Sequence, residues 1–447
     1  PPLSQYLIAI GIWIGSHLPF GQEITNDLTG STLAPWTYRW LNALTGSFIP
    51  LVVGAIAFQL TRRSSYALIS SLLIAADGLF LVESRYALNN IYLVIFGLLG
   101  HLCLLIALKS RTKKRWLWLI TCGIMLGFSA SIKWNGLGFI LGLFLVFIAC
   151  AAVECLRFFK LNQKFRQQAK VAREKFRYSS KIKWRSPLSK LPLLGLARIL
   201  FILALLPVLC YSLIWIPHLI LNPEYDFLEM QKQIMGYHQK IGDGKDVHPY
   251  CSKWYSWPFM VRPILYFYKN TAQLEEPDAS LPPITAGSDR VIFDVHAMGN
   301  PVLWWLSTLA IFLLLLILIA RLWVWIKYEL MRKKSDRNLQ LSTFPPPPEM
   351  WLLVYLVFNW LANFLPWAKV SRCIFLYHYM SSYVFAILAL SWWIERWLRS
   401  RKTHLKVLGI TTILLVLLAF NFWLPVYLGL PLSPFGWKIR IWFSSWI

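Results

Sequence analysis

Apolar runs of about twenty residues recur along the whole of this 447-residue chain. A helix that crosses the hydrocarbon core of a bilayer needs about 20 predominantly apolar residues. Hydrophobic residues make up 57% of the chain, charged residues only 15%, and the mean hydropathy is +0.52, which is too apolar for a soluble domain. We therefore expect an all-α polytopic membrane protein. Its predicted spans are residues 41–60, 66–83, 90–108, 116–131, 136–153, 194–217, 301–320, 350–366, 374–394 and 407–425.

The charges orient these spans. Lys and Arg outnumber Asp and Glu by 45 to 20, a formal net charge of +25. In a soluble protein this excess would suggest nucleic acid, but in a membrane protein short basic loops mark the cytoplasmic side. Basic segments at 109–115, 154–190, 321–337 and 395–406 are therefore placed in the cytoplasm. Residues 222–300 carry ten of the chain's 20 acids against seven Lys and Arg, so this loop is placed outside.

The chain is predicted to be one transmembrane domain, 1–447. The apolar run at 3–18 is expected to lie along the outer interface, because a span there would reverse every later loop and violate the charge rule. The basic loop is expected to lie against anionic headgroups rather than to bind nucleic acid. The predicted parts are an outer interfacial segment at 1–40, a basic cytoplasmic loop at 154–190, an extracytoplasmic loop at 222–300 and a C-terminal four-helix transmembrane part at 301–447.

Cationic and polar groups gather at the predicted outer ends of the spans. Arg85 follows the second span, Lys133 lies in the next outer turn, and Arg372, Tyr377 and His378 lie at a third. Cations on this side run against the positive-inside bias. One explanation is an anionic ligand that all of them share. The other is that each side chain reaches toward lipid phosphates.

The stretch at 248–269, HPYCSKWYSWPFMVRPILYFYK, is dense in aromatic and polar residues but lies outside every predicted span. Aromatic faces, hydrogen-bonding groups and fixed cations are what a sugar attached to a phosphate requires. We interpret the stretch as an active-site loop. An interfacial aromatic belt is equally compatible with its composition. Its candidate residues are His248, Tyr250, Ser252, Lys253, Trp254 and Arg262.

Other motifs are scarce. The seven cysteines are scattered, mostly within apolar runs, so neither a disulfide framework nor a zinc site is predicted. The predicted outer side carries no Asp-x-Asp pair or histidine cluster, so we expect no metal and no cofactor. The chain opens at Pro1 without Met and without a charged segment before an apolar core. No signal peptide is therefore expected, and the natural N-terminus is expected to lie upstream.

Seven blocks of the sequence, in family order and over nearly the whole chain, resemble the polyprenol-phosphate-mannose-dependent protein O-mannosyltransferases, which belong to the GT-C class of membrane glycosyltransferases. The blocks are PPLSQYLIAI, ADGLFLVESRYALNNIYL, SASIKWNGLG, HPYCSKWYSWPFMVRPI, MGNPVLWW, NFLPWAKVSRCIFLYHYMSSYVFAILAL and LPVYLGLPLSPFGWKIRIWFSSWI. The resemblance implies a GT-C-type helical bundle with outer juxtamembrane helices and loops. The loop at 222–300 is too short for the β-trefoil module of eukaryotic members, which implies the compact bacterial form in a plasma membrane.

The implied activity is transfer of mannose from polyprenyl-phosphate-mannose to Ser or Thr hydroxyls of proteins at the extracytoplasmic face, with inversion and without a metal. Implied partners are membrane lipids, the lipid-linked donor, and secreted or membrane proteins met during translocation, and not nucleic acid. The sequence departs from the family pattern twice. The acid taken as catalytic base in the family is expected upstream of Pro1, together with one more span. Asn90 stands where an acid is usual, which puts a charge role there in doubt.

In such a reaction a carboxylate must take the proton of the acceptor hydroxyl, and fixed cations must stabilise the departing phosphate. Plainer roles stay open for individual residues. Arg85 could pair with Asp77 on one helix face, Lys133 could cap the preceding helix, and His378 could be a buried, hydrogen-bonded histidine. The substrate-binding candidates are Arg85, Lys133, His248, Tyr250, Ser252, Lys253, Trp254, Arg262, Arg372, Tyr377 and His378.

Two other functions fit the same membrane pattern. One is a related GT-C enzyme that glycosylates a lipid or a cell-wall polymer. The other is a non-enzymatic transporter, which also carries intramembrane charge. A transporter needs polar residues along a path through the middle of the membrane, whereas the polar residues here gather at one interface.

Overall fold

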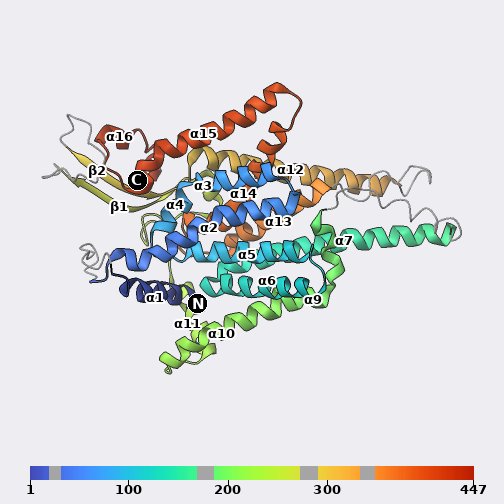
Figure 1. The fold of residues 1–447 in the computed structure, drawn as a ribbon, viewed down its shortest axis with the longest axis horizontal. Helices are drawn as coiled ribbons and strands as arrows, with labels where there is room; N and C mark the ends of the chain where they lie inside the picture. The colour runs from blue at the N-terminus through green and yellow to red at the C-terminus, as the bar shows by residue number, and fades with distance from the viewer. Residues whose placement is uncertain (20–31, 169–185, 272–289, 333–347) are drawn as a thin grey trace.

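The structure of the chain is a computed structural model that describes residues 1–19, 32–168, 186–271, 290–332 and 348–447. The predicted segments at 1–40 and 154–190 therefore lie partly outside the described residues. Within the described residues, long helices lie side by side in a bundle (Figure 1). The bundle helices are α2 (Pro35–Thr61), α3 (Ser64–Ala75), α4 (Gly78–Arg85), α5 (Asn90–Ala107), α6 (Thr112–Ile132), α7 (Leu137–Gln168), α9 (Leu196–Leu200), α10 (Leu206–Leu221), α12 (Pro301–Arg332), α13 (Pro348–Phe364), α14 (Met380–Leu398) and α15 (Thr403–Leu428).

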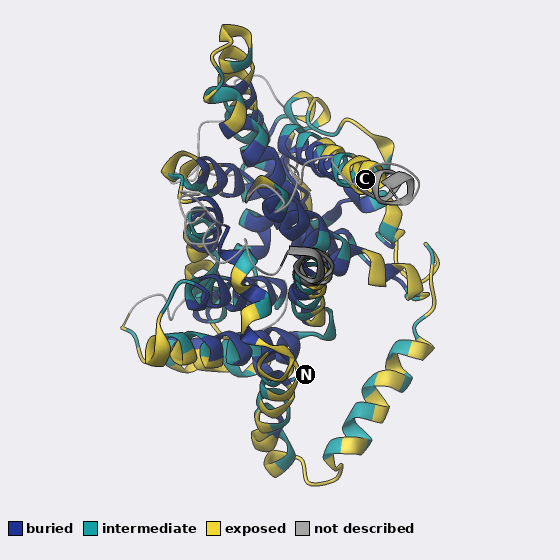
Figure 2. Cartoon of the chain, turned by 90° about the vertical axis from the view of Figure 1, so that its right-hand side faces the viewer, coloured by how far each residue is buried: buried dark blue, intermediate teal, exposed yellow. Residues whose placement is uncertain are grey.

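The apolar helices have the lengths that a bilayer requires. Among the described residues, eight helices are long and apolar enough to cross a membrane, and the bent pair α3 and α4 makes a ninth span if it is counted as one. The 19-residue α14 lies inside the bundle, with nearly every residue from Met380 to Glu395 buried. Outward-facing residues such as Leu213, Ile220 and Leu418 are apolar yet exposed. In Figure 2 the exposed residues lie on the outer faces of the helices and the buried ones inside the bundle. A bilayer would cover such faces, so the predicted all-α polytopic membrane fold is confirmed.

The predicted span at 66–83 is two helices rather than one, because α3 and α4 meet at 61°. Asp77 caps the start of α4, and its carboxylate accepts the backbone N–H of Phe80 at 3.1 Å. The side-chain amide of Asn300 donates to the carbonyl of Ala76 at 3.0 Å. The backbone groups released at the break thus find partners, which is the condition for a broken helix inside an apolar bundle.

A small antiparallel hairpin, β1 (Ile264–Thr271) and β2 (Val291–Ala297), was not predicted. Its register runs from Ile264 opposite Ala297 to Thr271 opposite Val291. The far side of β2 meets the C-terminal segment, where Ile292 and Leu432 exchange backbone hydrogen bonds of 2.8 and 2.9 Å. This hairpin lies at one end of the bundle, together with α1 (Leu3–Ser16) and α16 (Pro434–Lys438) (Figure 1). We call this the hairpin end.

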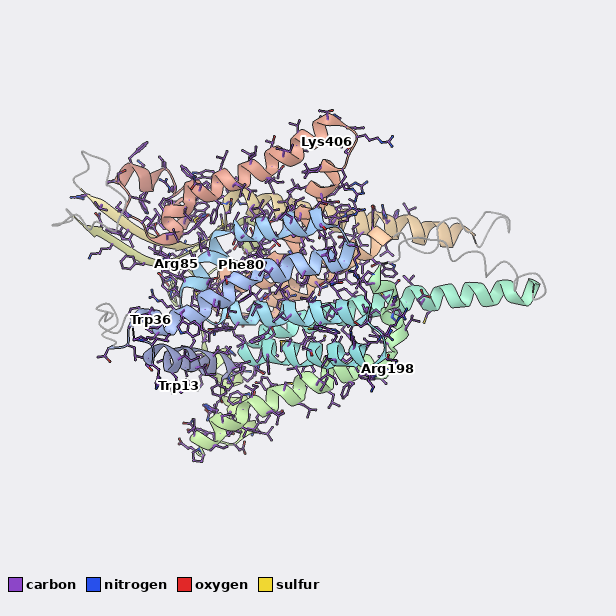
Figure 3. All side chains as sticks on the ribbon, viewed as in Figure 1. Trp13, Trp36, Phe80, Arg85, Arg198 and Lys406 are labelled. Atoms are coloured by element: carbon purple, nitrogen blue, oxygen red, sulfur yellow. A yellow bond between two sulfur atoms is a disulfide. The ribbon has the colours of Figure 1, made fainter. Side chains whose placement is uncertain are left out.

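The opposite end of the bundle carries the basic loops. Lys109 donates to the side-chain carbonyl of Gln59 at 2.9 Å, and Arg63 pairs with Glu395 at 2.9 Å. These contacts bring the predicted cytoplasmic loops between α2 and α3, α5 and α6, and α14 and α15 to one end. Figure 3 places Lys406 toward this end and Arg85 toward the hairpin end.

Candidate functional site

Glu83, in α4, is a fully buried carboxylate at the hairpin end. It accepts the phenolic O–H of Tyr266 from β1 and the side-chain N–H of Asn90 from the start of α5, the latter at 2.8 Å. A buried carboxylate is costly unless donors surround it. Glu83 therefore joins α4, α5 and the hairpin at one point.

Lys133 lies in the turn between α6 and α7 and reaches the same residues. We call Glu83, Asn90, Lys133, Tyr266 and Tyr377 the Lys133 group. Its Nζ donates to Oδ1 of Asn90 at 2.8 Å and lies 5.2 Å from the centroid of the Tyr377 ring. Burial lowers the pKa of the Lys133 ammonium to about 8, while the Glu83 carboxylate opposes this shift and Arg372 adds to it. Within the described parts of the chain, no carboxylate forms an ion pair with Lys133. Lys133 is thus half-buried, and its charge is not neutralised by a carboxylate in contact with it.

Arg372 and His378 are near this ammonium and have different electrostatic characters. Arg372 is half-buried and donates to the carbonyl of Cys373 at 3.0 Å. Burial lowers the pKa of its guanidinium, but arginine starts from so high a pKa that the group stays charged. Burial first, and the charges of Lys133 and Arg372 next, lower the pKa of His378 well below its usual value. His378 is therefore a neutral imidazole, whose Nδ1 accepts the backbone N–H of Phe375 at 3.1 Å. Its geometry fits the plainer interpretation, a buried hydrogen-bonded histidine.

Arg85 lies next to the aromatic residue Tyr86, which contacts Tyr266 beside Glu83. It closes α4 and donates to the carbonyl of Tyr427 in α15 at 2.8 Å. The next residue, Tyr86, meets the ring of Tyr266 edge-on, with the ring centroids 5.2 Å apart. The guanidinium of Arg39 lies 5.0 Å from the centroid of the same Tyr86 ring. Arg39 and Arg85 thus flank Tyr86 beside the Lys133 group.

The alternative pairing of Arg85 with Asp77 is wrong. Asp77 is fully occupied at the start of α4, where it also accepts the O–H of Tyr383 at 3.0 Å and the backbone N–H of Asn300 at 3.1 Å. Arg85 lies at the other end of this short helix. The break between α3 and α4 turns Asp77 into a helix cap, and sequence spacing over an unbroken helix does not show this.

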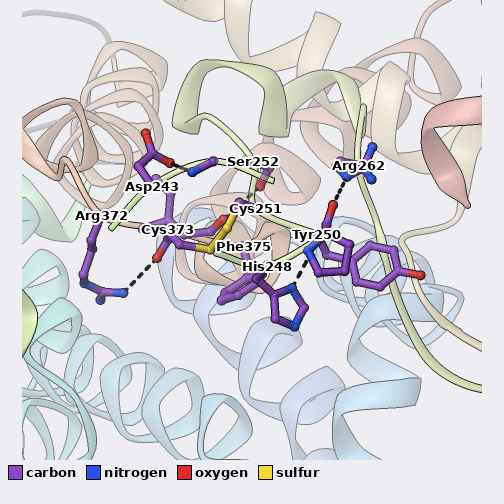
Figure 4. The surroundings of a disulfide bond; sticks show 12 residues. Asp243, His248, Tyr250, Cys251, Ser252, Arg262, Arg372, Cys373 and Phe375 are labelled. Carbon is purple, nitrogen blue, oxygen red and sulfur yellow. Dashed lines mark hydrogen bonds between the residues drawn. A yellow bond between two sulfur atoms is a disulfide. The ribbon is translucent and has the colours of Figure 1, made fainter. Parts of the chain in front are cut away.

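A disulfide joins Cys251 to Cys373 across 122 residues, with 5.2 Å between the Cα atoms (Figure 4). The prediction of no disulfide was therefore wrong. Scattered cysteines carry no spacing signal for a bond between two distant loops, and only their meeting at the hairpin end reveals it. The backbone N–H of Ser252 also donates to the carbonyl of Ile374 at 2.8 Å. These links hold the stretch before Met380 out of α14, so the span predicted at 374–394 begins too early.

The disulfide places the 248–262 loop on the segment that carries Tyr377. The ring of His248 meets Phe375 edge-on at 5.0 Å, and Phe375 stacks on Tyr377 at 5.4 Å. Ser252 is buried, and its Oγ accepts the indole N–H of Trp257 at 2.8 Å. The structure thus links His248 and Ser252 to the Lys133 group through one aromatic layer.

Two predicted cations of the loop have other contacts. Lys253 is exposed and pairs with Asp243. The Nε–H of Arg262 donates to the carbonyl of Pro249 at 2.5 Å, and the guanidinium lies 5.7 Å from the centroid of the Tyr250 ring (Figure 4). Tyr250 is half-buried beneath it. These contacts hold the loop together and do not bring either cation into the Lys133 group.

Trp254 packs against the helices rather than standing free. Its ring lies 5.0 Å from that of Phe364 in α13, whereas the neighbouring Tyr255 is exposed. A sugar-facing wall and an interfacial belt both remain compatible with these rings. The substrate-binding roles of all eleven candidates stay predictions.

Sequence reasoning missed Glu83, although it lies two residues before Arg85. The signal was present, since an acid in an otherwise apolar helix is by default a functional candidate. Sequence reasoning also missed Asp294 and His296 on β2, which hydrogen-bond to each other at 3.0 Å in the core of the hairpin end. No local pattern marks that pair, because its partners come from the C-terminal segment.

Family models match both halves of the chain. Residues 1–221 match the model described as dolichyl-phosphate-mannose-protein mannosyltransferase, and residues 223–446 match the C-terminal four-transmembrane region of protein O-mannosyltransferase. The chain belongs to the protein O-mannosyltransferase family. It is 23% identical to the polyprenol-phosphate-mannose–protein mannosyltransferase of Mycolicibacterium smegmatis, and the match covers 100% of this chain and 81% of that protein. It is 22% identical to the Corynebacterium glutamicum protein of the same name, with the same coverage.

The fold of the chain is similar to that of a solved family member. A Saccharomyces cerevisiae protein O-mannosyltransferase complex with bound sugar donor superposes with a TM-score of 0.69 at 14% identity, over 100% of this chain and 86% of that one. Family membership makes this protein a membrane glycosyltransferase, specifically a mannosyltransferase. The transporter interpretation is therefore wrong.

Proposed function

We propose that this protein O-mannosyltransferase moves mannose from polyprenyl-phosphate-mannose to Ser or Thr hydroxyls of proteins. The names of the bacterial relatives support the donor. The observation that carries the proposal is the half-buried Lys133 ammonium, which lies near Arg372 and has a neutral amide as its partner. A cation that is partly removed from water without a neutralising carboxylate is unfavourable unless an anion completes the arrangement.

The donor's leaving group is a phosphate monoester, which gains negative charge as the bond to the sugar breaks. Lys133 and Arg372 would stabilise this charge, since fixed cations act strongly in a site from which water is excluded. Removing one preorganised contact of this kind costs about 100- to 1,000-fold in rate. The ring of Tyr377 borders the ammonium and stacks on Phe375, and the two rings offer an apolar face for the mannose or the first isoprene.

The transfer is a single displacement. The acceptor oxygen forms a bond to the anomeric carbon as the carbon–oxygen bond to phosphate breaks, and the phosphate leaves with the bonding electrons. Attack from the face opposite the phosphate inverts the anomeric configuration. A carboxylate takes the hydroxyl proton. Glu83 and Asp77 each accept at least two hydrogen bonds within the bundle, so we assign neither as this base.

We place the site at the extracytoplasmic face of a plasma membrane. Disulfides persist in oxidising compartments, and the Cys251–Cys373 bond lies at the hairpin end beside the site. The basic loops around Lys109 and Arg399 lie at the opposite end, where the positive-inside rule puts the cytoplasm. Two independent observations thus support the same orientation. Acceptors would then be secreted or membrane proteins during translocation.

The test uses the full-length protein in liposomes with radiolabelled polyprenyl-phosphate-mannose and a peptide that carries Ser and Thr. We expect label on the peptide, and undiminished transfer in excess chelator, because side-chain cations replace a divalent ion on a monophosphate donor. Label on a lipid or a cell-wall polymer instead of peptide would contradict the acceptor class. Strict dependence on added manganese would contradict the metal-free mechanism.

A further inference from the structure

Glu83, Asn90 and Lys133 form a relay of hydrogen bonds across three elements. Asn90 donates to Oε2 of Glu83 through Nδ2 and accepts from Nζ of Lys133 through Oδ1, each at 2.8 Å. A carboxylate only accepts and an ammonium only donates, so the orientation of the Asn90 amide is determined by its two partners. Lys133 cannot change position without breaking this chain of contacts.

The amide between the two charges has an electrostatic consequence. A carboxylate in direct contact would pair with the ammonium and neutralise it. The amide passes on the hydrogen bond but carries no net charge. Lys133 therefore stays charged, and among the described residues it uses one of its three N–H groups, which leaves two for another acceptor.

We propose that Glu83 is a positioning residue of the transfer reaction, which acts through Asn90 to hold the Lys133 ammonium ready for the donor phosphate. The inference rests on the proposed function. It adds to that function a residue outside the expected site, since Glu83 itself does not touch the phosphate. Glu83 also accepts the O–H of Tyr266, so the same carboxylate fixes the hairpin beside the cation.

The surroundings of Lys133 show what the loss of Glu83 would change. The titratable groups that act on Lys133 or on its neighbours are Glu83 from α4, Tyr266 from β1, which bonds to Glu83, Arg372, Tyr377 and His378 from the segment before α14, and His238 from α11 (Phe227–Lys240), which acts on His378. Among these, Glu83 supplies the negative charge. Burial lowers the pKa of Lys133 and the Glu83 carboxylate raises it, and with both effects included this pKa is about 8. Without that carboxylate the pKa of Lys133 falls further, and the ammonium deprotonates at a lower pH.

The test compares pH–rate profiles of the full-length wild type and Glu83→Gln for mannose transfer. The activity of the variant should begin to fall at a pH about one unit lower than that of wild type, because Lys133 deprotonates there. This fall is the alkaline limb of the profile. Relative to wild type, the variant should therefore lose about tenfold more activity at high pH than at low pH. The KM for the acceptor peptide should not change, because the relay faces the donor. A folded Glu83→Gln protein with the wild-type alkaline limb would overturn the proposal.

A second variant keeps Glu83 and should shift the pKa of Lys133 in the opposite direction. Asn90→Asp puts an acid against both Lys133 and Glu83, and the two acids share one proton because two carboxylates in contact cannot both be ionised. The negative charge then lies directly against Lys133, which should raise the pKa of the ammonium and shift the loss of activity to higher pH. The substitution should nevertheless lower kcat/KM for the donor about tenfold or more, since the new carboxylate competes with the phosphate. An unchanged alkaline limb, or an unchanged kcat/KM for the donor, in this variant would contradict the relay.

Glu395→Gln is the matched control. Glu395 is also a buried acid, but it lies at the opposite end, paired with Arg63 and Arg399. Its substitution should lower thermal stability and leave the shape of the pH profile unchanged. A wild-type protein that transfers no mannose at any pH would refute the proposed function itself. A failure of the relay alone would leave wild-type transfer intact.

Discussion

At the scale of single residues, the cations of the candidate site differ in what their surroundings allow. Lys133 and Arg372 are half-buried, and their acceptors within the described residues are neutral oxygens. Lys253 is exposed and already paired with Asp243. A residue type in the right loop is therefore not sufficient for a role in phosphate binding. Whether a cation can bind phosphate depends on whether it is shielded from water and whether a carboxylate already pairs with it.

Arg372 and His378 provide a contrast that tests this distinction. Arg372→Met should lower kcat/KM for the donor about 100-fold, because a fixed charge near the leaving phosphate is lost. His378→Asn should leave kcat/KM within about threefold and lower the thermal unfolding temperature instead, because the neutral imidazole holds the backbone of Phe375. Steady-state kinetics and a thermal melt of both variants check the pair. Equal losses of activity would show that His378 also meets the substrate.

The sequence predicted the residues of this site unevenly. Lys133, Tyr377 and Arg372 were expected at one end of the bundle from charge and span alternation alone, and the structure brings them near one another. Glu83 was not expected, because its role depends on the break between α3 and α4 and on a hairpin strand that arrives 183 residues later in the chain. Hydrophobic patterns report burial but not which distant groups meet.

At the scale of elements, the disulfide replaces a continuous helix with a tethered turn. Hydrophobicity alone extends the predicted span back to residue 374, whereas the segment before Met380 is bound to the 248–262 loop. The tether positions Phe375 and Tyr377 beside Lys133. The loop and the site are thus one unit although their sequences are far apart.

Removal of this tether should therefore affect both stability and activity. Replacing both cysteines, Cys251→Ser with Cys373→Ser, should lower the free energy of unfolding by about 2–4 kcal/mol. It should also raise the KM for the donor, since the aromatic layer beside Lys133 loosens. Thermal melts and donor titrations measure the two effects. Cys210→Ser, at a free cysteine of α10, is the control and should change neither.

Helix packing makes a separate prediction. A Cβ atom at Gly142 of α7 would meet the side-chain carbonyl of Asn359 in α13. Gly142→Ala should therefore destabilise the protein by about 1–3 kcal/mol through overpacking. Gly236 in α11 faces open space, and Gly236→Ala should stabilise its helix by about 0.5–1 kcal/mol. Melting temperatures that shift in the same direction would contradict this account of the α7–α13 contact.

At the scale of the whole molecule, the two ends of the bundle are chemically different. One end has the basic loops and the Arg63–Glu395–Arg399 group, and the other has the hairpin, the disulfide and the Glu83–Lys133 relay. The order of helices and the separation of these ends followed from hydrophobicity and charge. The hairpin did not, because a short two-stranded sheet leaves only a weak local pattern beside long apolar spans.

Membrane-impermeant labelling tests the orientation. In a Cys155→Ser background, which removes an exposed thiol, a cysteine in place of the exposed Asn270 should react from outside intact cells. A cysteine in place of the exposed Lys402 should react only after the membrane is opened. The positive-inside rule predicts this order. Reaction of the second position in intact cells would place the site on the cytoplasmic side.

The central claim is that a half-buried, unneutralised ammonium at the hairpin end, that of Lys133, stabilises the phosphate of the lipid-linked donor. The most direct measurement is kcat/KM for polyprenyl-phosphate-mannose of Lys133→Met against Lys402→Met, both in the full-length protein. We predict a loss of about 100-fold for the first and less than about twofold for the second, whose exposed side chain lies at the opposite end. A folded Lys133→Met enzyme that keeps wild-type kcat/KM for the donor would contradict the account.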